Sequence, residues 1–235
     1  MTVTYQGNRL KIILTDIEGT TTDISFVHEV LFPYSAKHLS GWVHNHLELP
    51  IIQDILQQVR EISGQSNLDV ESCLSNLMIW HTEDRKITPL KTLQGLIWQE
   101  GYDSGELKAH VYPDAVECLQ HWYAAGLKLA IYSSGSVAAQ KLLFKNTLMG
   151  DLTPLFSMYF DTTTGNKTES QSYLTIADEL LVLPQEILFL SDSSKELAAA
   201  RAANFNVCGL NRQTTDVDPN FMYVTKFSQI PLELF

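Results

Sequence analysis

Short apolar runs alternate with helical patterns through the carboxy-terminal half of the chain, and this alternation constrains the fold more than any other feature. The runs are too short for helices and rich in aliphatic residues, which is typical of strands buried on both faces. They lie at residues 127–132, 158–160, 187–190 and 206–210, and the helical patterns lie at residues 113–125, 137–148, 170–181 and 195–203. Strands and helices in this order form a parallel sheet with helices on both faces. The sequence therefore predicts an α/β fold with a Rossmann-like parallel sheet as its core.

The first strand of this sheet is predicted much earlier, at the apolar run that begins at Lys11. The run ends in a turn that contains two carboxylates, Asp16 and Glu18, followed by Gly19. Parallel sheets bind ligands at the carboxyl ends of their strands, so Asp16 is a candidate site residue. From this stretch alone, a solvated strand-to-loop turn explains Asp and Gly equally well, because both residues are common in turns for conformational reasons.

A helical insertion separates the first strand from the rest of the sheet. Apolar residues recur at helical spacing over residues 27–31, 35–47, 51–62, 70–80 and 90–100, and Pro33, Pro50 and Pro89 stand near helix starts. We therefore expect two domains. Residues 1–24 and 112–235 form the sheet-containing core, and residues 25–111 form a helical cap that is inserted after the first strand.

The charge of the chain limits its partners. It carries 16 Lys and Arg against 27 Asp and Glu, a net charge of −11. This charge would repel a polyanion, so we expect no nucleic-acid partner. A small phosphorylated metabolite is compatible with it, because a bound divalent cation and one well-placed Lys can invert the local field.

No targeting, membrane or disulfide pattern is found in the sequence. Residues Met1 to Arg9 lack the apolar core of a signal peptide, and no run approaches the roughly 20 apolar residues of a membrane span. Cys73, Cys118 and Cys208 lack the paired spacing of a disulfide framework or zinc site, and we expect buried thiols. These observations predict a soluble, cytoplasmic protein with no membrane partner.

Polar side chains follow four of the predicted strands, and all of them would face one edge of the sheet. They are Asp16 and Glu18 after the first strand, Ser133 and Ser134 after the second, Lys167 in the loop after the third, and Asp192 after the fourth. Two carboxylates from different strands, with backbone carbonyls and water, form an oxygen site suited to Mg²⁺. A hydroxyl, backbone N–H groups and a Lys hold phosphoryl oxygens. An Asp beside them can attack phosphorus, and a second carboxyl can transfer protons.

These motifs resemble those of the haloacid dehalogenase superfamily of aspartate-nucleophile phosphatases, and more closely those of its enolase-phosphatase family. The first motif of the superfamily is a strand ending in Asp-x-Asp, and Glu18 in place of the second Asp is the enolase-phosphatase pattern. Further similar stretches are residues 19–22, 24–27, 31–34, 84–86, 93–98, 132–136, 139–144, 160–167 and 189–192. The resemblance therefore covers nearly the whole chain.

The resemblance implies a haloacid dehalogenase-like core with an inserted helical cap, and a role for each candidate. Asp16 resembles the nucleophile and a ligand of one Mg²⁺ ion per subunit, and Glu18 resembles the acid/base, which also meets the metal through its backbone carbonyl. Ser133 and Ser134 are similar to the residues on the phosphoryl group, Lys167 to the Lys that neutralises it, and Asp192 to the second carboxylate ligand of the metal. Glu196, the next acid after Asp192, is left out of the ligand set.

The resemblance also implies a reaction. Enolase-phosphatases of methionine salvage enolise 2,3-diketo-5-methylthiopentyl-1-phosphate and then hydrolyse the phosphate, releasing the acireductone. The resemblance also favours a monomer that acts on this small phosphorylated diketone. Two alternatives stay open: a phosphatase of the same superfamily that acts on another small phosphate ester, and a receiver domain, against which the long helical insertion argues. The base that drives enolisation, Glu18 or a group on the insertion, stays open too.

Overall fold

The computed structural model describes residues 10–212 and 217–235, so the polar stretch Met1–Arg9 lies outside the described residues. The chain divides into two compact units. The core unit comprises Met1–Ile24 and Ala109–Phe235, and the helical unit comprises Ser25–Lys108. The second boundary falls at Lys108, not at residue 111 as expected from the sequence. The backbone N–H of Ala109 donates to the carbonyl of Asn146 at 2.9 Å, which ties this segment to the core unit.

The described residues of the core unit form one six-stranded parallel sheet with the order β3-β2-β1-β4-β5-β6. The strands are β1 (Ile12–Thr15), β2 (Lys128–Tyr132), β3 (Phe156–Phe160), β4 (Ile187–Ser191), β5 (Asn206–Leu210) and β6 (Tyr223–Val224). This sheet confirms the predicted α/β fold. The edge strand β6 was not predicted, because a two-residue strand has no apolar run to reveal it.

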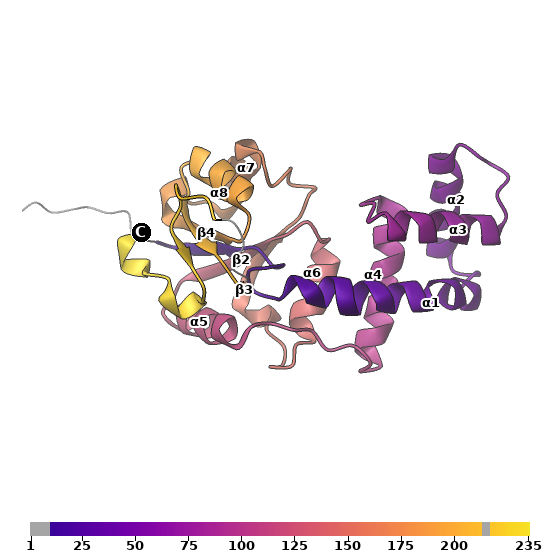
Figure 1. The fold of residues 1–235 in the computed structure, drawn as a ribbon, viewed down its shortest axis with the longest axis horizontal. Helices are drawn as coiled ribbons and strands as arrows, with labels where there is room; N and C mark the ends of the chain where they lie inside the picture. The colour runs from indigo at the N-terminus through magenta and orange to yellow at the C-terminus, as the bar shows by residue number, and fades with distance from the viewer. Residues whose placement is uncertain (1–9, 213–216) are drawn as a thin grey trace, which may run out of the picture. The chain divides into compact units, whose positions relative to one another are not determined.

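Helices cover both faces of this sheet (Figure 1). They are α5 (Pro113–Ala124), α6 (Val137–Lys145), α7 (Ser170–Leu180) and α8 (Ser194–Ala202), with short 3₁₀ turns at Thr153–Leu155, Pro184–Glu186, Phe227–Gln229 and Leu232–Leu234. Tyr173 of α7 and Leu197 of α8 pack against Leu14 and Phe189 of the two central strands, and all four side chains are buried. Helices α5 and α6 pack on β2 and β3. Because β1 and β4 are buried between the two layers, their carboxyl ends have fixed positions.

The helical unit consists of η1 (Phe26–Leu31), α1 (Phe32–Asn45), α2 (Pro50–Ser63), α3 (Val70–Thr82) and α4 (Thr88–Asp103). The predicted break before residue 35 is wrong, because the π-helical turn η1 runs directly into α1. Pro33 stands in the first turn of α1. The unit has its own apolar core, which includes Leu39 of α1, Leu56 of α2, Leu77 of α3 and Leu93 of α4.

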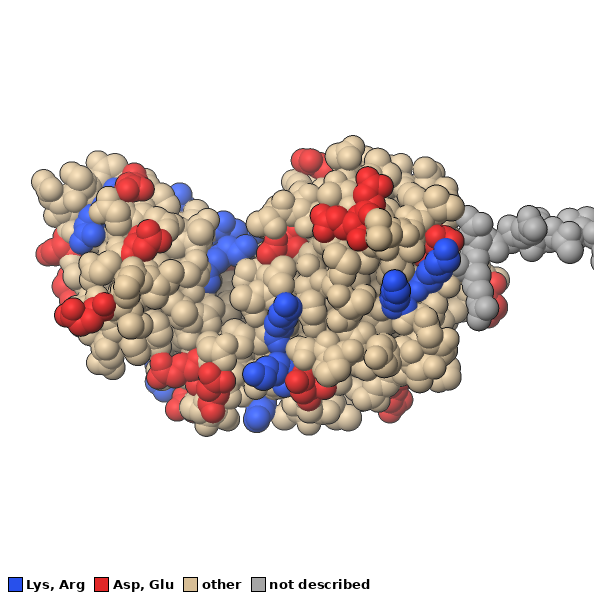
Figure 2. Space-filling model, turned by 180° about the vertical axis from the view of Figure 1, so that it is seen from behind, with Lys and Arg blue, Asp and Glu red and all other residues tan. Residues whose placement is uncertain are grey.

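The remaining features of the fold are its surface and its cysteine side chains. No helix in the described ranges is long and apolar enough to cross a membrane. On the face shown in Figure 2, acidic and basic side chains are both scattered over the surface. Cys73 and Cys208 are buried free thiols, as expected, whereas Cys118 on α5 is only partly buried.

Candidate active site

Asp16 stands directly beyond β1, at the carboxyl edge of the sheet. Its backbone N–H donates to the carbonyl of Leu190 at 2.9 Å, which continues the β1–β4 ladder by one residue. The chain then turns sharply, because the carbonyl of Ile17 accepts the N–H groups of the three threonines at 20, 21 and 22 at 3.2, 2.9 and 3.0 Å. The side chain of Asp16 is 6% exposed and therefore has a fixed, largely desolvated place at the strand end.

Gly19 in this turn is required for two reasons. Its φ of +72° lies in the left-handed region, which favours glycine. A Cβ at this position would fall 2.2 Å from Oδ2 of Asp192. The carboxylate of Asp192, just beyond β4, therefore lies against the turn that carries Asp16 and Glu18.

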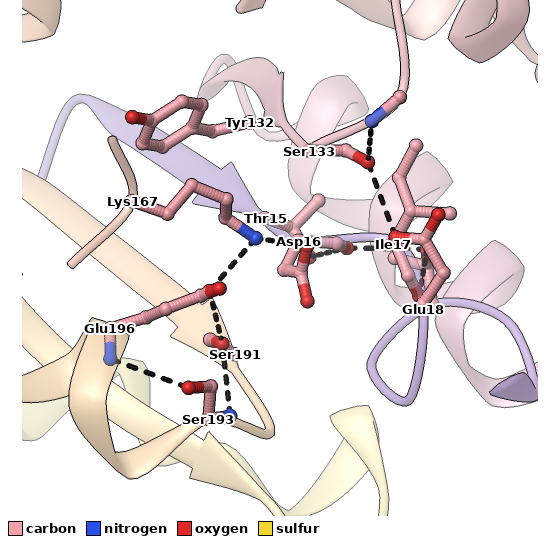
Figure 3. Close-up of polar contacts among 12 residues, drawn as sticks. Thr15, Asp16, Ile17, Glu18, Tyr132, Ser133, Lys167, Ser191, Ser193 and Glu196 are labelled. Atoms are coloured by element: carbon pink, nitrogen blue, oxygen red, sulfur yellow. Dashed lines mark hydrogen bonds and ion pairs between the residues drawn. The ribbon is translucent and has the colours of Figure 1, made fainter. Parts of the chain in front are cut away.

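Lys167 reaches the same point from the loop after β3 and contacts two carboxylates there (Figure 3). Its Nζ lies 2.5 Å from Oδ1 of Asp16 and 2.8 Å from Oε2 of Glu196, and the Lys167 side chain is 6% exposed. Burial lowers the pKa of Lys167, but the charges of Asp16 and Glu196 outweigh it and raise this pKa above its usual value. The ammonium group therefore stays charged beside Asp16.

Aromatic hydroxyls hold the loop that carries Lys167. The Tyr132 hydroxyl donates to the carbonyl of Gly165 at 3.0 Å, and the Tyr173 hydroxyl donates to the carbonyl of Lys167 at 2.7 Å. The ammonium nitrogen lies 5.7 Å from the centroid of the Tyr132 ring (Figure 3). The position of Lys167 is thus set by side chains from β2 and α7.

Ser133 and Glu18 form a second contact at this edge. The Ser133 hydroxyl donates to Oε2 of Glu18 at 3.2 Å and accepts the N–H of Gly135 at 3.2 Å (Figure 3). Ser134 follows in the same turn before α6 and is partly buried. The structure therefore pairs Asp16 with Lys167 and Glu18 with Ser133, with Asp192 beside their turn, and it places Ser134 next to Ser133.

The crowding of acids at this edge changes their proton affinity. Burial, followed by the charge of Asp16, raises the pKa of Glu18 above its usual value. The same two causes raise the pKa of Asp192 to about 6, although Asp192 is exposed at the surface. Mutual repulsion of carboxylates raises their pKa, and a cation relieves it. Lys167 is one such cation, and a divalent cation that Asp16 and Asp192 could hold would be another.

The oxygen ligands suit a hard divalent cation, although the described residues contain no cluster of three or more His, Cys, Asp or Glu side chains arranged as a metal site. The predicted set needs only two side-chain carboxylates, Asp16 and Asp192, because its third protein ligand is the backbone carbonyl of Glu18. Carboxylates, a carbonyl and water are what Mg²⁺ binds. The residues present therefore fit the metal that the sequence predicts.

Glu196 is the residue at this edge that sequence reasoning left out. It lies in the first turn of α8, where Ser193 caps the helix and accepts the N–H of Glu196 at 3.4 Å. Its carboxylate turns to the strand ends, where it accepts the Ser191 hydroxyl at 2.8 Å and pairs with Lys167. A signal was available, because Ser193 and Glu196 have the spacing of a capping box, which places a carboxylate over the first turn of a helix.

Asp161, another acid beyond a strand end, has a structural role. Its Oδ2 accepts the N–H of Val137 at 3.1 Å, and its Oδ1 accepts the N–H of Thr163 at 2.9 Å. It therefore holds the start of α6 and the loop after β3. Its carboxylate is occupied with backbone donors, in contrast to that of Asp16.

Comparison with known proteins agrees with this geometry. A family model of haloacid dehalogenase-like hydrolases matches residues 10–204. Enolase-phosphatase E1 of Pseudomonas fluorescens is 52% identical over 226 residues, which cover 96% of this chain and 99% of that protein. Enolase-phosphatase E1 of Sulfurihydrogenibium sp. is 53% identical over 226 residues, 95% of this chain and 98% of that protein.

Solved structures share the fold. The crystal structure of the UTR4 protein from Saccharomyces cerevisiae has a TM-score of 0.81 at 34% identity, covering 94% of this chain and 100% of that one. CbbY from Rhodobacter sphaeroides, solved in complex with phosphate, has a TM-score of 0.60 at 14% identity, covering 94% and 96%. The family model and the identity to these enolase-phosphatase relatives over nearly the whole chain show that the chain belongs to the enolase-phosphatase E1 family of haloacid dehalogenase-like hydrolases.

Proposed function

We propose that this protein is an acireductone synthase, a bifunctional enolase-phosphatase of methionine salvage. It enolises 2,3-diketo-5-methylthiopentyl-1-phosphate and then removes the phosphate, giving the acireductone. The observation that carries the proposal is the turn beyond β1, which holds Asp16 beside Lys167 at 2.5 Å and Glu18 within 3.2 Å of Ser133. Relatives with half of their residues identical over nearly the whole chain are named enolase-phosphatase E1.

Phosphate release follows from these contacts in two steps. A carboxylate oxygen of Asp16 attacks phosphorus, and the bond between phosphorus and the substrate oxygen breaks while Glu18 donates a proton to that oxygen. Water then attacks the aspartyl-phosphate, Glu18 takes the water proton, and the bond between phosphorus and the Asp16 oxygen breaks. The raised pKa of Glu18 suits both steps. It favours a carboxyl that is protonated when the leaving oxygen needs a proton, and it makes the carboxylate a stronger base when water gives up a proton.

The positive and hydrogen-bonding groups around Asp16 hold the phosphoryl oxygens. Lys167 neutralises the charge that gathers on them, and the hydroxyls of Ser133 and Ser134 with the N–H groups of their turn donate hydrogen bonds. Burial of Lys167 strengthens this contribution, because less water competes for its charge. The Lys167 ammonium must leave part of its contact with Asp16 to reach a phosphoryl oxygen, and Glu196 keeps it anchored meanwhile.

Asp16, Asp192 and the backbone carbonyl of Glu18 would hold one Mg²⁺ per subunit. When bound, the ion neutralises carboxylate charge and polarises an oxygen of the substrate. Burial, followed by the charge of Asp16, raises the pKa of Asp192, and a bound cation would offset that charge. We further propose that the helical unit is the inserted cap domain of this family, and that the protein acts as a cytoplasmic monomer.

Removal of divalent cations is expected to abolish phosphate release. We expect enzyme treated with EDTA and then desalted to be inactive, and added Mg²⁺ to restore activity, because without the cation the negative charges of Asp16 and Asp192 repel the substrate phosphate. The measurement is phosphate release at fixed enzyme concentration across a Mg²⁺ titration. Thermal unfolding of both forms serves as the control, since a loss of fold would also abolish turnover. Full turnover by metal-free, folded enzyme would contradict the assignment of the cation site.

Turnover of the diketone phosphate tests the proposed substrate. We expect the enzyme to give two signals from it, the absorbance of the enediol and one equivalent of inorganic phosphate. A simple alkyl phosphate without a carbonyl serves as the control substrate, and it can give only the phosphate signal. Phosphate release from the control without any enediol signal from the diketone would assign the protein to the alternative, a phosphatase for another ester.

A further inference from the structure

A buried arginine holds the turn of Asp16 and Glu18 from outside the proposed catalytic groups. Arg212 follows β5, which ends at Leu210, and its side chain is 6% exposed. Its Nε donates to the carbonyl oxygen of Thr20 at 3.1 Å. Thr20 is fully buried and is part of the turn that folds over the carbonyl of Ile17. Arg212 therefore contacts the backbone of the turn directly, two residues after Glu18.

The guanidinium of Arg212 is itself fixed on several sides. Its Nη1 donates to both carboxylate oxygens of Asp114, at 3.0 and 2.9 Å. Asp114 lies in the first turn of α5 and also accepts the N–H of Phe227 at 2.7 Å. The guanidinium carbon lies 4.2 Å from the ring centroid of Tyr112 and 5.3 Å from that of Phe227. A planar group with several donors fits such surroundings, and the single point charge of a lysine does not.

Neighbouring residues of the turn are tied down in the same way. The carbonyl of Thr21 accepts the N–H of Tyr112 at 2.9 Å, and the hydroxyl of Thr22 donates to the carbonyl of His110. These two contacts come from the segment before α5. The contact of Arg212 with Thr20 comes from a third part of the chain, beyond β5, so Arg212 and Asp114 together join β5, α5 and the turn.

We propose that Arg212, paired with Asp114, is a positioning residue for the proposed reaction. It acts through the Thr20 carbonyl, which keeps the turn in the shape that aims Asp16 at Lys167 and Glu18 at Ser133. Catalytic groups must be held within a fraction of an ångström of their working positions, and supporting hydrogen bonds achieve this. The inference rests on the proposed function, because it assigns Arg212 to the catalytic turn of that reaction.

Arg212→Lys tests the inference. Lysine keeps the charge beside Asp114 but cannot bind both the carboxylate and the Thr20 carbonyl with the geometry of a guanidinium. We expect kcat to fall roughly 10- to 100-fold. KM should stay nearly unchanged, because the phosphate-binding groups remain. Amide hydrogen exchange at residues 20–22 should become faster, whereas exchange in the strands of the core unit should not change. Asp114→Asn should reproduce the same pattern more weakly.

Arg201→Lys is the matched control. Arg201 on α8 also stacks on an aromatic ring, 4.1 Å from the centroid of Phe221, and also donates to a backbone carbonyl, that of Asn220 at 2.8 Å. Among the described residues, Arg201 forms no hydrogen bond, ion pair or ring contact with the turn, so its replacement should leave kcat and exchange at residues 20–22 unchanged.

Three outcomes decide the inference. Faster exchange confined to the turn, together with a lower kcat, supports it. Unchanged exchange and kcat in Arg212→Lys overturn it, and so does faster exchange spread evenly over the core unit, which indicates general destabilisation only. If Arg212→Lys does not fold, Asp114→Asn is judged by the same criteria. The exchange measurement needs no substrate, so it tests the inference even if wild-type enzyme fails to form the acireductone, an outcome that would count against the proposed function instead.

Discussion

Replacement of Asp16 by Asn is expected to eliminate phosphate release while leaving the fold intact. The amide cannot attack phosphorus, and loss of a nucleophile lowers kcat on the order of 10⁴- to 10⁶-fold in well-studied enzymes. The fold should persist because Lys167 keeps its second partner, Glu196, at 2.8 Å. The buried ammonium is therefore not left without a counter-charge.

Phosphate release and circular dichroism of Asp16→Asn should be measured beside those of Asp161→Asn. Asp161 is also a buried acid beyond a strand end, but its oxygens accept backbone N–H groups. The control should keep activity within a few-fold of wild type. Appreciable turnover by folded Asp16→Asn, or equal loss in both variants, would remove Asp16 from the role of nucleophile.

Lys167→Met is expected to impair both catalysis and stability. Methionine has a similar length without the charge, so Asp16 and Glu196 would face each other across an apolar side chain. Loss of one partner from a buried ion pair costs about 3–5 kcal/mol, and loss of a charge that stabilises the transition state lowers kcat about 10²- to 10³-fold. Steady-state kinetics and urea unfolding of the metal-free protein measure the two effects.

The pH dependence of stability gives this variant a signature. Burial, followed by the charge of Asp16, raises the pKa of Glu196 to about 7 in the wild type, against 4.5 for an unperturbed Glu. The folded state therefore binds more protons than the unfolded state between these values, and stability falls as pH rises through this window. Lys167 lowers the pKa of Glu196, so its removal should extend the loss of stability to higher pH.

Lys141→Met is the control for both measurements. Lys141 on α6 is exposed, and its ammonium lies 5.5 Å from the centroid of the Tyr159 ring, away from the strand-end carboxylates. Its removal should change neither kcat nor the slope of stability with pH. A Lys167→Met variant with wild-type kinetics and an unchanged slope would show that Lys167 serves neither the phosphate nor the buried acids.

The candidate site could be predicted from the sequence as far as strand ends determine it. Asp16, Ser133 and Asp192 each follow an apolar run, and parallel strands bring their carboxyl ends to one edge whatever their order. This prediction needs only the sequence. The role of Glu18 was inferred from the resemblance, because the strand does not fix the position of a side chain two residues beyond Asp16. The structure shows Glu18 against Ser133.

Residues outside the strand ends were harder to predict. The rule of strand ends brought Lys167 and Asp16 to one edge but did not predict their direct contact, because β3 and β1 are separated by β2 in the sheet. Glu196 was left out because only the turn of α8 brings it back to the edge. The unit boundary at Lys108 and the continuous helix through Pro33 also differ from the sequence-based expectation, because both depend on hydrogen bonds and turns that local sequence patterns do not encode.

By itself, then, the sequence determined the parallel sheet, the helical insertion, the family and the acids and hydroxyls at the strand ends, because these follow from local hydrophobic patterns and from motifs contiguous in the chain. Only the tertiary structure decided that Lys167 bridges Asp16 and Glu196, and that Arg212 supports the turn from the far side of β5. Those contacts join residues up to 192 positions apart, Thr20 and Arg212. The strand order and the packing of helices on the sheet set such distances, and no local spacing in the chain records them.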